Sequence, residues 1–300
     1  MRNWRMSTLL VGLMLLVSLL TGACGSRQTA GVEGAGQQSN PSRLVVQVLD
    51  VGQADAILIR TPRENILIDT GDAATKDKVV SYIKSQGITS LDKVIITHAH
   101  ADHLGGMTAV IENIAVRQIY DSAFPATTAT YRNYLTLVKK RQIPFARLRA
   151  GDQVDLGGGA ELRILAPEKE FIKGSNSDVN NSSIVARLSY GDFSMLLTGD
   201  AESESEAIMV KRFGSALKSR VLKSPHHGSR TSSSPAFLKA VAPETVVIST
   251  GAGNEYGHPH AAVMKRYQNA KLTVYRTDHD GTVTISSDGK TYTVTKEKGR

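Results

Sequence analysis

Three histidines and one aspartate lie within six consecutive residues, in the stretch His98-Ala99-His100-Ala101-Asp102-His103. The stretch follows the apolar run at residues 94–96, which predicts a buried strand. A neutral imidazole offers one ring nitrogen to a metal ion, and a carboxylate offers an anionic oxygen. Three imidazoles and a carboxylate at a strand end are unsuited to a core, and their spacing is far more specific than a lone histidine. The stretch therefore predicts a metal site.

Alternate residues of an irregular turn point apart, which divides this cluster in two. His98 and His100 can face one ion, while Asp102 and His103 face another. The two glycines at residues 105–106 allow the backbone to pass close beneath such a site.

Other apolar runs are followed, at their carboxyl end, by an acidic residue or a histidine. The run 66–68 leads to Asp69, and the run 195–197 leads to Asp200. The run 221–222 leads to the pair at residues 226–227, and the run 246–248 leads to His258. Side chains at the ends of strands in rigid sheets can be held accurately, as two-metal chemistry requires. Any one of these could be a capped turn, but four of them favour a shared site.

Composition limits the kind of site. The chain has 300 residues, 41% of them hydrophobic, which is enough for a sizeable core. Cys24 is the only cysteine, so an internal disulfide is excluded and a metal must be held by histidines and carboxylates. The net charge is +8, or +6 without the two arginines of the N-terminal segment, and favours polyanions such as nucleic acid. The same charge could serve solubility alone.

The N-terminus has the pattern of an export signal. Two arginines precede an apolar run that is too short for a membrane helix, so residues 1–23 are predicted to be a signal peptide. Cys24 follows small residues and resembles a bacterial lipobox cysteine, which predicts lipidation there and an extracytoplasmic, membrane-anchored lipoprotein; simple secretion is the alternative. Residues 24–42 are predicted to be a flexible tether. Residues 43–300 are predicted to form one domain.

The domain divides into two halves, each with strands followed by alternating helices and strands. This order predicts an α/β fold in which two sheets pack together with helices outside. Strands are expected at 44–49, 56–59, 66–68, 94–96, 116–120, 161–165, 183–188, 193–198, 219–222, 245–249 and 272–275. Helices are expected at 76–85, 104–113, 130–141, 203–213, 235–241 and 261–269, and a closing hairpin turns at residues 288–289.

The order Asp-Thr-Gly at 69–71, His-x-His-x-Asp-His at 98–103 and Thr-Gly-Asp at 198–200 resembles the metallo-β-lactamase superfamily. The resemblance spans residues 43–300. It implies an αββα sandwich of two mixed sheets, with the site at the edges of the sheets.

Four further motifs resemble the extracellular hydrolase domain of ComEC competence proteins: LDVGQADA at 49–56, PHHGS at 225–229, YGHP at 256–259 and RTD at 276–278. Ala54 replaces a glycine common in the first motif. The third metal-binding histidine of many superfamily members is missing, and Asn180-Asn181 stands there, as in the ComEC type.

The resemblance implies a role for each matching residue. His98 and His100 would bind the first metal ion, and Asp102 and His103 the second. Asp200 would bridge both ions. His227 would complete the second site, with the adjacent His226 as the rival that sequence cannot separate from it.

The remaining matching residues would support the ligands or the reaction. Asp69 and Asn181 would not bind a metal themselves but would orient the residues that do. His226 and His258 would lie near phosphate oxygens and act in catalysis together with Asp102. His260 and His279 are expected to be surface or locally bonded histidines.

These inferences predict a surface-anchored phosphodiesterase or nuclease that acts on DNA through hydroxide held between two divalent ions. Zn²⁺ suits the ligands best, Mn²⁺ also fits, and no other cofactor is expected. The expected partners are a nucleic acid or other phosphodiester and the outer face of the membrane. One alternative keeps the metals but hydrolyses a small ester, a phosphorylcholine ester, a lactam or a lactone. Another is a binding lipoprotein without catalysis.

Overall fold

Two β-sheets lie face to face in the computed structural model, which describes residues 41–298. The described residues belong to one compact unit. The predictions for the signal peptide, for Cys24 and for nearly all of the tether lie outside them. No helix among the described residues is long and apolar enough to cross a membrane.

The first sheet has eight strands and is mixed. Its three opening strands form an antiparallel meander, and the strands that follow on that side of the sheet pair in parallel. In spatial order the strands are β17 (Tyr292–Lys296), β16 (Val283–Ser287), β1 (Leu44–Val48), β2 (Ile57–Arg60), β3 (Asn65–Ile68), β5 (Lys93–Ile96), β7 (Ile119–Asp121) and β8 (Phe145–Arg147).

The second sheet has seven strands and is also mixed. Its strands are β15 (Thr273–Arg276), β14 (Thr245–Ile248), β13 (Val221–Lys223), β12 (Phe193–Leu197), β11 (Val185–Tyr190), β10 (Ala160–Ala166) and β9 (Gln153–Asp155). The strands β12 to β15 run parallel to one another, so their carboxyl ends meet at one edge. A small separate pair joins β4 (Ser90–Leu91) and β6 (Ala115–Val116).

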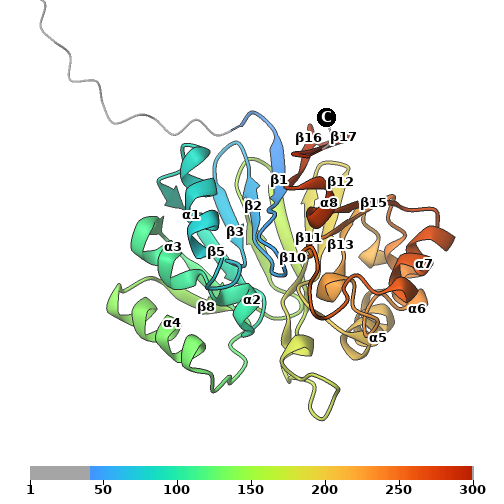
Figure 1. The fold of residues 1–300 in the computed structure, drawn as a ribbon, viewed down its shortest axis with the longest axis horizontal. Coiled ribbons are helices and arrows are strands. Elements are labelled where there is room, and N and C mark those ends of the chain that lie inside the picture. The colour runs from blue at the N-terminus through green and yellow to red at the C-terminus, as the bar shows by residue number, and fades with distance from the viewer. Residues whose placement is uncertain (1–40, 299–300) are drawn as a thin grey trace, which may run out of the picture. The chain divides into compact units, whose positions relative to one another are not determined.

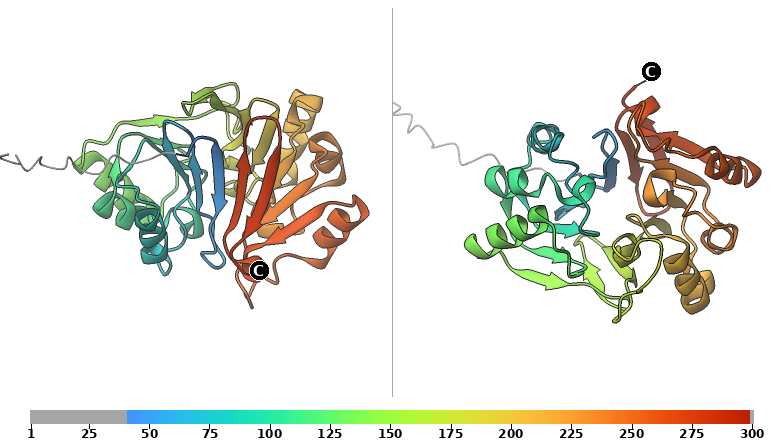
Figure 2. Two further views of the ribbon diagram at one scale, coloured as in Figure 1. Left: turned by 90° about the horizontal axis from the view of Figure 1, so that it is seen from above. Right: turned by 60° about the horizontal axis from the view of Figure 1, so that its bottom comes forward.

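Helices cover the outer face of each sheet, as Figures 1 and 2 show. The first sheet carries α1 (Lys76–Ser85), α3 (Met107–Asn113) and α4 (Ala129–Lys140), and the second carries α5 (Ser203–Phe213), α6 (Pro235–Val241) and α7 (Ala261–Asn269). The shorter helices are α2 (Ala101–Leu104), α8 (Thr277–Asp280) and three 3-10 turns, η1 (Asn180–Ser182), η2 (Gly214–Leu217) and η3 (Pro225–Gly228).

Alternation along the strands produces three apolar cores. In β12, Met195 and Leu197 point into the core between the sheets, while Leu196 points toward α5 to α7. In β3, Ile66 and Ile68 point inward and Leu67 points toward α1 and α3. Because both faces of a strand are buried, its sequence reads as a continuous apolar run. The predicted αββα sandwich is confirmed.

Three details differ from the predicted elements. Instead of the expected helix at 104–113, α2 ends at Leu104 and α3 begins at Met107. Between them the backbone passes so close to Thr70 that a β-carbon at Gly106 would lie 2.1 Å from the carbonyl oxygen of Thr70, so only glycine fits there. The expected strand at 116–120 is divided between β6, which ends at Val116, and β7, which begins at Ile119. The strands β8 and β9 were not predicted; all three residues of β8 are exposed, so they carry no hydrophobic pattern.

Candidate metal centre

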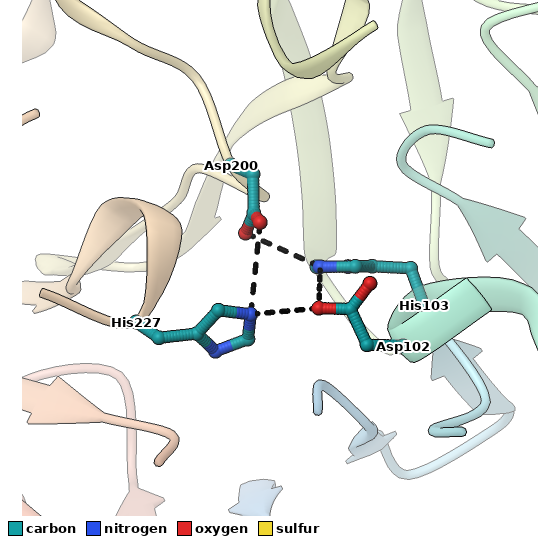
Figure 3. A group of neighbouring side chains, drawn as sticks. All are labelled: Asp102, His103, Asp200 and His227. Atoms are coloured by element: carbon teal, nitrogen blue, oxygen red, sulfur yellow. Dashed lines mark hydrogen bonds and ion pairs between the residues drawn. The ribbon is translucent and has the colours of Figure 1, made fainter. Parts of the chain in front are cut away.

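Four side chains from three separate segments converge at the edge where the parallel strands end. Asp102 and His103 lie on α2, directly after β5. Asp200 follows β12, and His227 lies in η3 after β13. Figure 3 shows all four pointing toward one another. One half of the sandwich therefore supplies two of these groups, and the other half supplies the remaining two.

The distances between the polar atoms of this group are short. His103 Nε2 lies 3.2 Å from Asp200 Oδ1, and His227 Nε2 lies 3.2 Å from Asp102 Oδ2. The other two histidine–aspartate distances, His103 Nε2 to Asp102 Oδ2 and His227 Nε2 to Asp200 Oδ2, are 3.6 Å each. One ligand atom from each residue lies within 4.8 Å of all the others. Two nitrogens and two carboxylate oxygens so placed match the donor set of a divalent transition metal.

Two atoms of this group support metal binding independently. His103 Nε2 and Asp200 Oδ1 are buried and face each other at 3.2 Å, but neither makes a hydrogen bond of good geometry within the described residues. A buried polar atom without a hydrogen bond is destabilising, and a metal ion would satisfy both atoms at once. The residues present therefore fit a divalent ion.

Asp69 orients His103 by contacting the ring nitrogen that faces away from the four-residue group. Its Oδ2 lies 2.7 Å from His103 Nδ1, and its two oxygens also accept hydrogen bonds from the backbone and hydroxyl of Thr97, at 2.8 and 2.7 Å. Because His103 Nδ1–H donates to this carboxylate, the lone pair of Nε2 is free to face the centre of the group. The structure therefore places Asp69 against a candidate ligand, and its supporting role stays a prediction.

His227 is oriented in the same way by a carbonyl. Its Nδ1 donates to the backbone oxygen of Ser249 at 3.0 Å, which turns Nε2 toward Asp102 and Asp200. Beneath it, the fully buried Lys223 and Asp55 form an ion pair at 2.8 Å. This buried ion pair packs beneath His227 and helps to hold it in place.

The neighbouring histidine has a different environment. His226 Nε2 lies 3.8 Å from Asp200, and His226 Nδ1 lies 3.1 Å from Glu202 Oε1. Both His226 and His227 have positive φ values, 49° and 53°, which are costly for residues with a β-carbon. This turn sends the two adjacent rings to different places: His227 joins the four-residue group, and His226 lies beside it against a carboxylate.

His98 and His100 form a pair on the other side of His103. His98 Nε2 and His100 Nδ1 lie 3.1 Å apart. Burial and the nearby charge of His103 lower the pKa of His98 well below its usual value, so its ring is neutral and able to bind a metal. The described residues place no third histidine or carboxylate around this pair in a compact group. The structure thus brings together a group of four possible ligands, a buried group of three (Asp55, Asp69 and His103) and the His98–His100 pair. The two-ion arrangement stays a prediction.

The asparagines at the position of the missing histidine have separate contacts. Asn181 Oδ1 accepts hydrogen bonds from the backbone of Glu202 and Ser205, at 3.1 and 3.3 Å, and so holds the start of α5. Asn180, not Asn181, faces the site; its amide donates to Glu202 Oε1 at 3.1 Å. Asn181 therefore acts on the segment after Asp200 and does not face the four-residue group.

His258 is held by Gln53 across 205 residues of sequence. Gln53 Oε1 accepts from the backbone N–H of Gly251 at 3.1 Å, so its amide nitrogen is the end that faces His258 Nδ1, at 3.2 Å. That nitrogen of His258 is then an acceptor, and the proton of the neutral ring sits on Nε2. Burial and the charges of His227 and His226 lower the pKa of His258 to about 4, so it is a neutral donor at pH 7.

The other two histidines agree with the expectation of local bonding. His260 Nδ1 accepts a hydrogen bond from the backbone of Arg230 at 3.1 Å. His279 is mostly exposed, beside Asp278.

The carboxylates of the group are ionised. Burial alone would raise the pKa of Asp200, but the charges of His103 and His227 outweigh it and lower the pKa well below the usual value. The same two histidines lower the pKa of Asp102 against the effect of burial. Anionic oxygens are therefore present at neutral pH, as metal binding requires.

The group opens into a cavity of about 340 Å³. Its lining is mostly polar and, among the ten described residues that form it, contains no lysine or arginine: Gln53, His100, Ala101, Asp102, Asn180, Asp200, His226, His227, Tyr256 and His258. Two of these are carboxylates, which would repel an anionic substrate. Bound cations would offset this repulsion.

Reasoning from sequence assigned no role in the site to Gln53, Glu202 or Tyr256. Gln53 and Tyr256 lie within short motifs, which was the available signal, but their contacts cross long stretches of chain. Glu202 lies just before α5, where an acidic residue is explained equally well by the helix dipole.

Comparisons with known proteins agree with the fold. The sequence profile of the "Metallo-beta-lactamase superfamily" matches residues 49–252. "ComE operon protein 3" of Bacillus subtilis is 29% identical over 256 residues, covering 79% of this chain and 32% of its own length. "Competence protein ComA" of Neisseria gonorrhoeae is 34% identical over 239 residues, covering 79% of this chain and 31% of its own. The chain thus spans about a third of these relatives.

Among solved structures, the metallo-beta-lactamase fold protein YhfI from Bacillus subtilis is similar in fold, with a TM-score of 0.50 and 14% identity. The match covers 77% of this chain and 96% of that one.

Proposed function

The chain belongs to the metallo-β-lactamase superfamily, and we propose that it is a metal-dependent phosphodiesterase that cleaves nucleic acid. The observation that carries the proposal is the open, polar cavity around Asp102, His103, Asp200 and His227. A small apolar ester or lactam would favour an enclosed apolar pocket. Relatives named for competence and a net charge of +8 support a nucleic-acid substrate.

In this proposal the four-residue group would hold a divalent ion, His98 and His100 would hold a second, and Asp200 would be shared between them. Zn²⁺ and Mn²⁺ both suit nitrogen and carboxylate ligands. When bound, such ions lower the pKa of a coordinated water and neutralise charge on phosphoryl oxygens. Asp69 and Ser249 keep the ligand nitrogens turned toward the ions.

His226 and His258 have distinct tasks in this proposal. His258 presents a fixed Nε2–H that donates to a phosphoryl oxygen and stabilises charge in the transition state. His226 has a carboxylate behind its Nδ1, the arrangement of a proton-transfer histidine, and delivers a proton to the leaving alkoxide. The chain needs no serine or cysteine nucleophile.

The test is a substrate panel with protein loaded with Zn²⁺ or Mn²⁺. We expect cleavage of single-stranded DNA, double-stranded DNA or bis-p-nitrophenyl phosphate by the unmodified protein, and loss of cleavage in Asp200→Asn. Asp192→Asn, the same change on an exposed turn, is the matched control and should retain activity. The proposal is wrong if the loaded protein opens a lactam or a lactone but cleaves no phosphodiester.

Anchoring at Cys24 on the outer face of the membrane is a separate part of the proposal, supported by the lone cysteine after an export signal. Cells expressing the full chain should incorporate labelled palmitate into it. Cys24→Ala should remove the label and release the protein from the membrane fraction. Equal labelling of both forms would contradict lipidation at this cysteine.

A further inference from the structure

Tyr256 is an unusual residue at the mouth of the cavity. It is 61% exposed, against 39% and 38% for the next large apolar side chains in the described part of the chain. Its ring lies nearly parallel to that of His258, with an interplanar angle of 23° and 5.7 Å between centroids. One face of the phenol ring is thus turned toward the cavity wall, and most of the side chain remains open to solvent.

The loop that carries Tyr256 is held at both ends. Asn254 donates to the carbonyl oxygens of Gly251 and His258, at 2.9 and 2.6 Å, and accepts from the backbone N–H of His258 at 2.9 Å. Gln53 fastens the start of the loop and the ring of His258 together. Because the fold already orders the loop, little conformational entropy remains to be lost when a ligand packs on the ring.

A line of rings connects Tyr256 to the candidate metal ligands. The ring of His258 is 6.3 Å from that of His227 and inclined to it by 23°. A phosphate beside His227 and His258 would therefore place the next nucleotide of the same strand along this line, toward Tyr256.

We propose that Tyr256 is a stacking platform for a nucleobase next to the scissile phosphate, which makes single-stranded nucleic acid the substrate of this site. The inference deepens the proposed phosphodiesterase function and rests on it. Stacking on an aromatic ring is worth about 1–3 kcal/mol per base and does not depend on base identity. In a duplex the faces of the bases are already stacked on each other, so they are not available to the ring.

The test compares two single-stranded oligonucleotides of the same length and charge. One carries all its bases, and the other carries abasic sites around a single cleavable phosphodiester. In Tyr256→Ala we expect KM for the base-bearing strand to rise roughly 5- to 150-fold with little change in kcat, as the loss of 1–3 kcal/mol of stacking implies. KM for the abasic strand should stay unchanged. Tyr256→Phe keeps the ring and should behave like the unmodified protein on both.

The outcomes separate this inference from the proposed function. If Tyr256→Ala changes KM equally for both strands, or for neither, the platform is wrong, although cleavage by the unmodified protein still supports the phosphodiesterase. If the unmodified protein cleaves neither strand nor any other phosphodiester, the proposed function itself fails. Unfolding temperature and metal content of Tyr256→Ala should match those of the unmodified protein; a loss of either would indicate a structural role and overturn the inference.

Discussion

At the scale of single residues, the adjacent histidines 226 and 227 show what sequence can and cannot determine. The motif identifies the pair, but only the backbone decides which ring enters the four-residue group. Positive φ values at both positions turn His227 inward and leave His226 against Glu202. Neither torsion follows from residue type, because histidine rarely adopts this conformation.

Substituting each histidine in turn tests this assignment. We expect His227→Ala to weaken divalent-metal affinity by more than about 100-fold, since even the hydrogen-bonding partners of ligands contribute about 10- to 100-fold. His226→Ala should keep the metal and lose turnover. Isothermal titration with Mn²⁺ and a cleavage assay measure the two effects. The reverse result, with metal lost only in His226→Ala, would exchange the two roles.

The ion pair between Lys223 and Asp55 gives a second prediction at this scale. Lys223→Met leaves the Asp55 carboxylate buried without its partner, so the free energy of unfolding should fall by about 3–5 kcal/mol. Urea denaturation measures this loss. Adding Asp55→Asn should restore part of the stability. The exposed Lys218→Met is the control, with an effect within about 0.5 kcal/mol; an equally small effect of Lys223→Met would contradict the structural role of the pair.

At the scale of elements, the strand ends organise the site. The sequence predicts that apolar runs end in Asp69, Asp200 and the histidine pair, and the structure brings these ends to one edge. The contacts that fasten the site were not predictable, because they join loops distant in sequence, as Gln53 and His258 do across 205 residues. An amide beside a histidine has no local signature.

The backbone between α2 and α3 holds the histidine cluster in place. Thr70 binds the carbonyl oxygen of His103 through its backbone N–H at 2.6 Å, and Gly106 packs against the carbonyl of Thr70. Gly106→Ala should therefore displace this segment, lower the stability by about 3 kcal/mol or more, and weaken metal binding.

Gly87→Ala is the control for this substitution. Gly106 has an ordinary φ of −81°, whereas Gly87 has a positive φ of 72°, and a β-carbon at Gly87 would have nothing within 4 Å. It should lose only about 1–2 kcal/mol, the price of the left-handed conformation, and keep its metal affinity. Thermal unfolding measures the stability of both variants, and metal titration measures their metal affinity. Equal effects would show that the close approach of Gly106 to Thr70 is unimportant.

At the scale of the whole molecule, the candidate centre joins the two halves of the sandwich. Asp102 and His103 belong to the first half, and Asp200 and His227 to the second. A metal that binds only the folded state stabilises it by about 2.7 kcal/mol at a concentration 100 times its Kd, which corresponds to a rise in Tm of roughly 5–10 °C. Scanning calorimetry with Zn²⁺ or Mn²⁺ should show this rise, and EDTA should reverse it. An unchanged Tm would indicate that no metal bridges the halves.

The same shift in Tm should depend on pH. In the metal-free protein, carboxylates around His103 and His227 outweigh burial and raise the pKa of both rings, so protons compete with the metal. Raising the pH removes this competition. The metal-induced shift should therefore be larger at pH 8 than at pH 6, in buffers that do not bind the metal. A larger shift at pH 6 would contradict the assignment of these histidines as ligands.

The most direct test of the account is the metal content of three purified proteins after dialysis against a limiting concentration of divalent metal: the unmodified chain, Asp200→Asn and the exposed control Asp192→Asn. Asp200 contributes a buried carboxylate that faces His103 and His227. The account predicts that the unmodified chain and Asp192→Asn retain metal and that Asp200→Asn loses most of it while remaining folded. Equal metal content in all three proteins would contradict it.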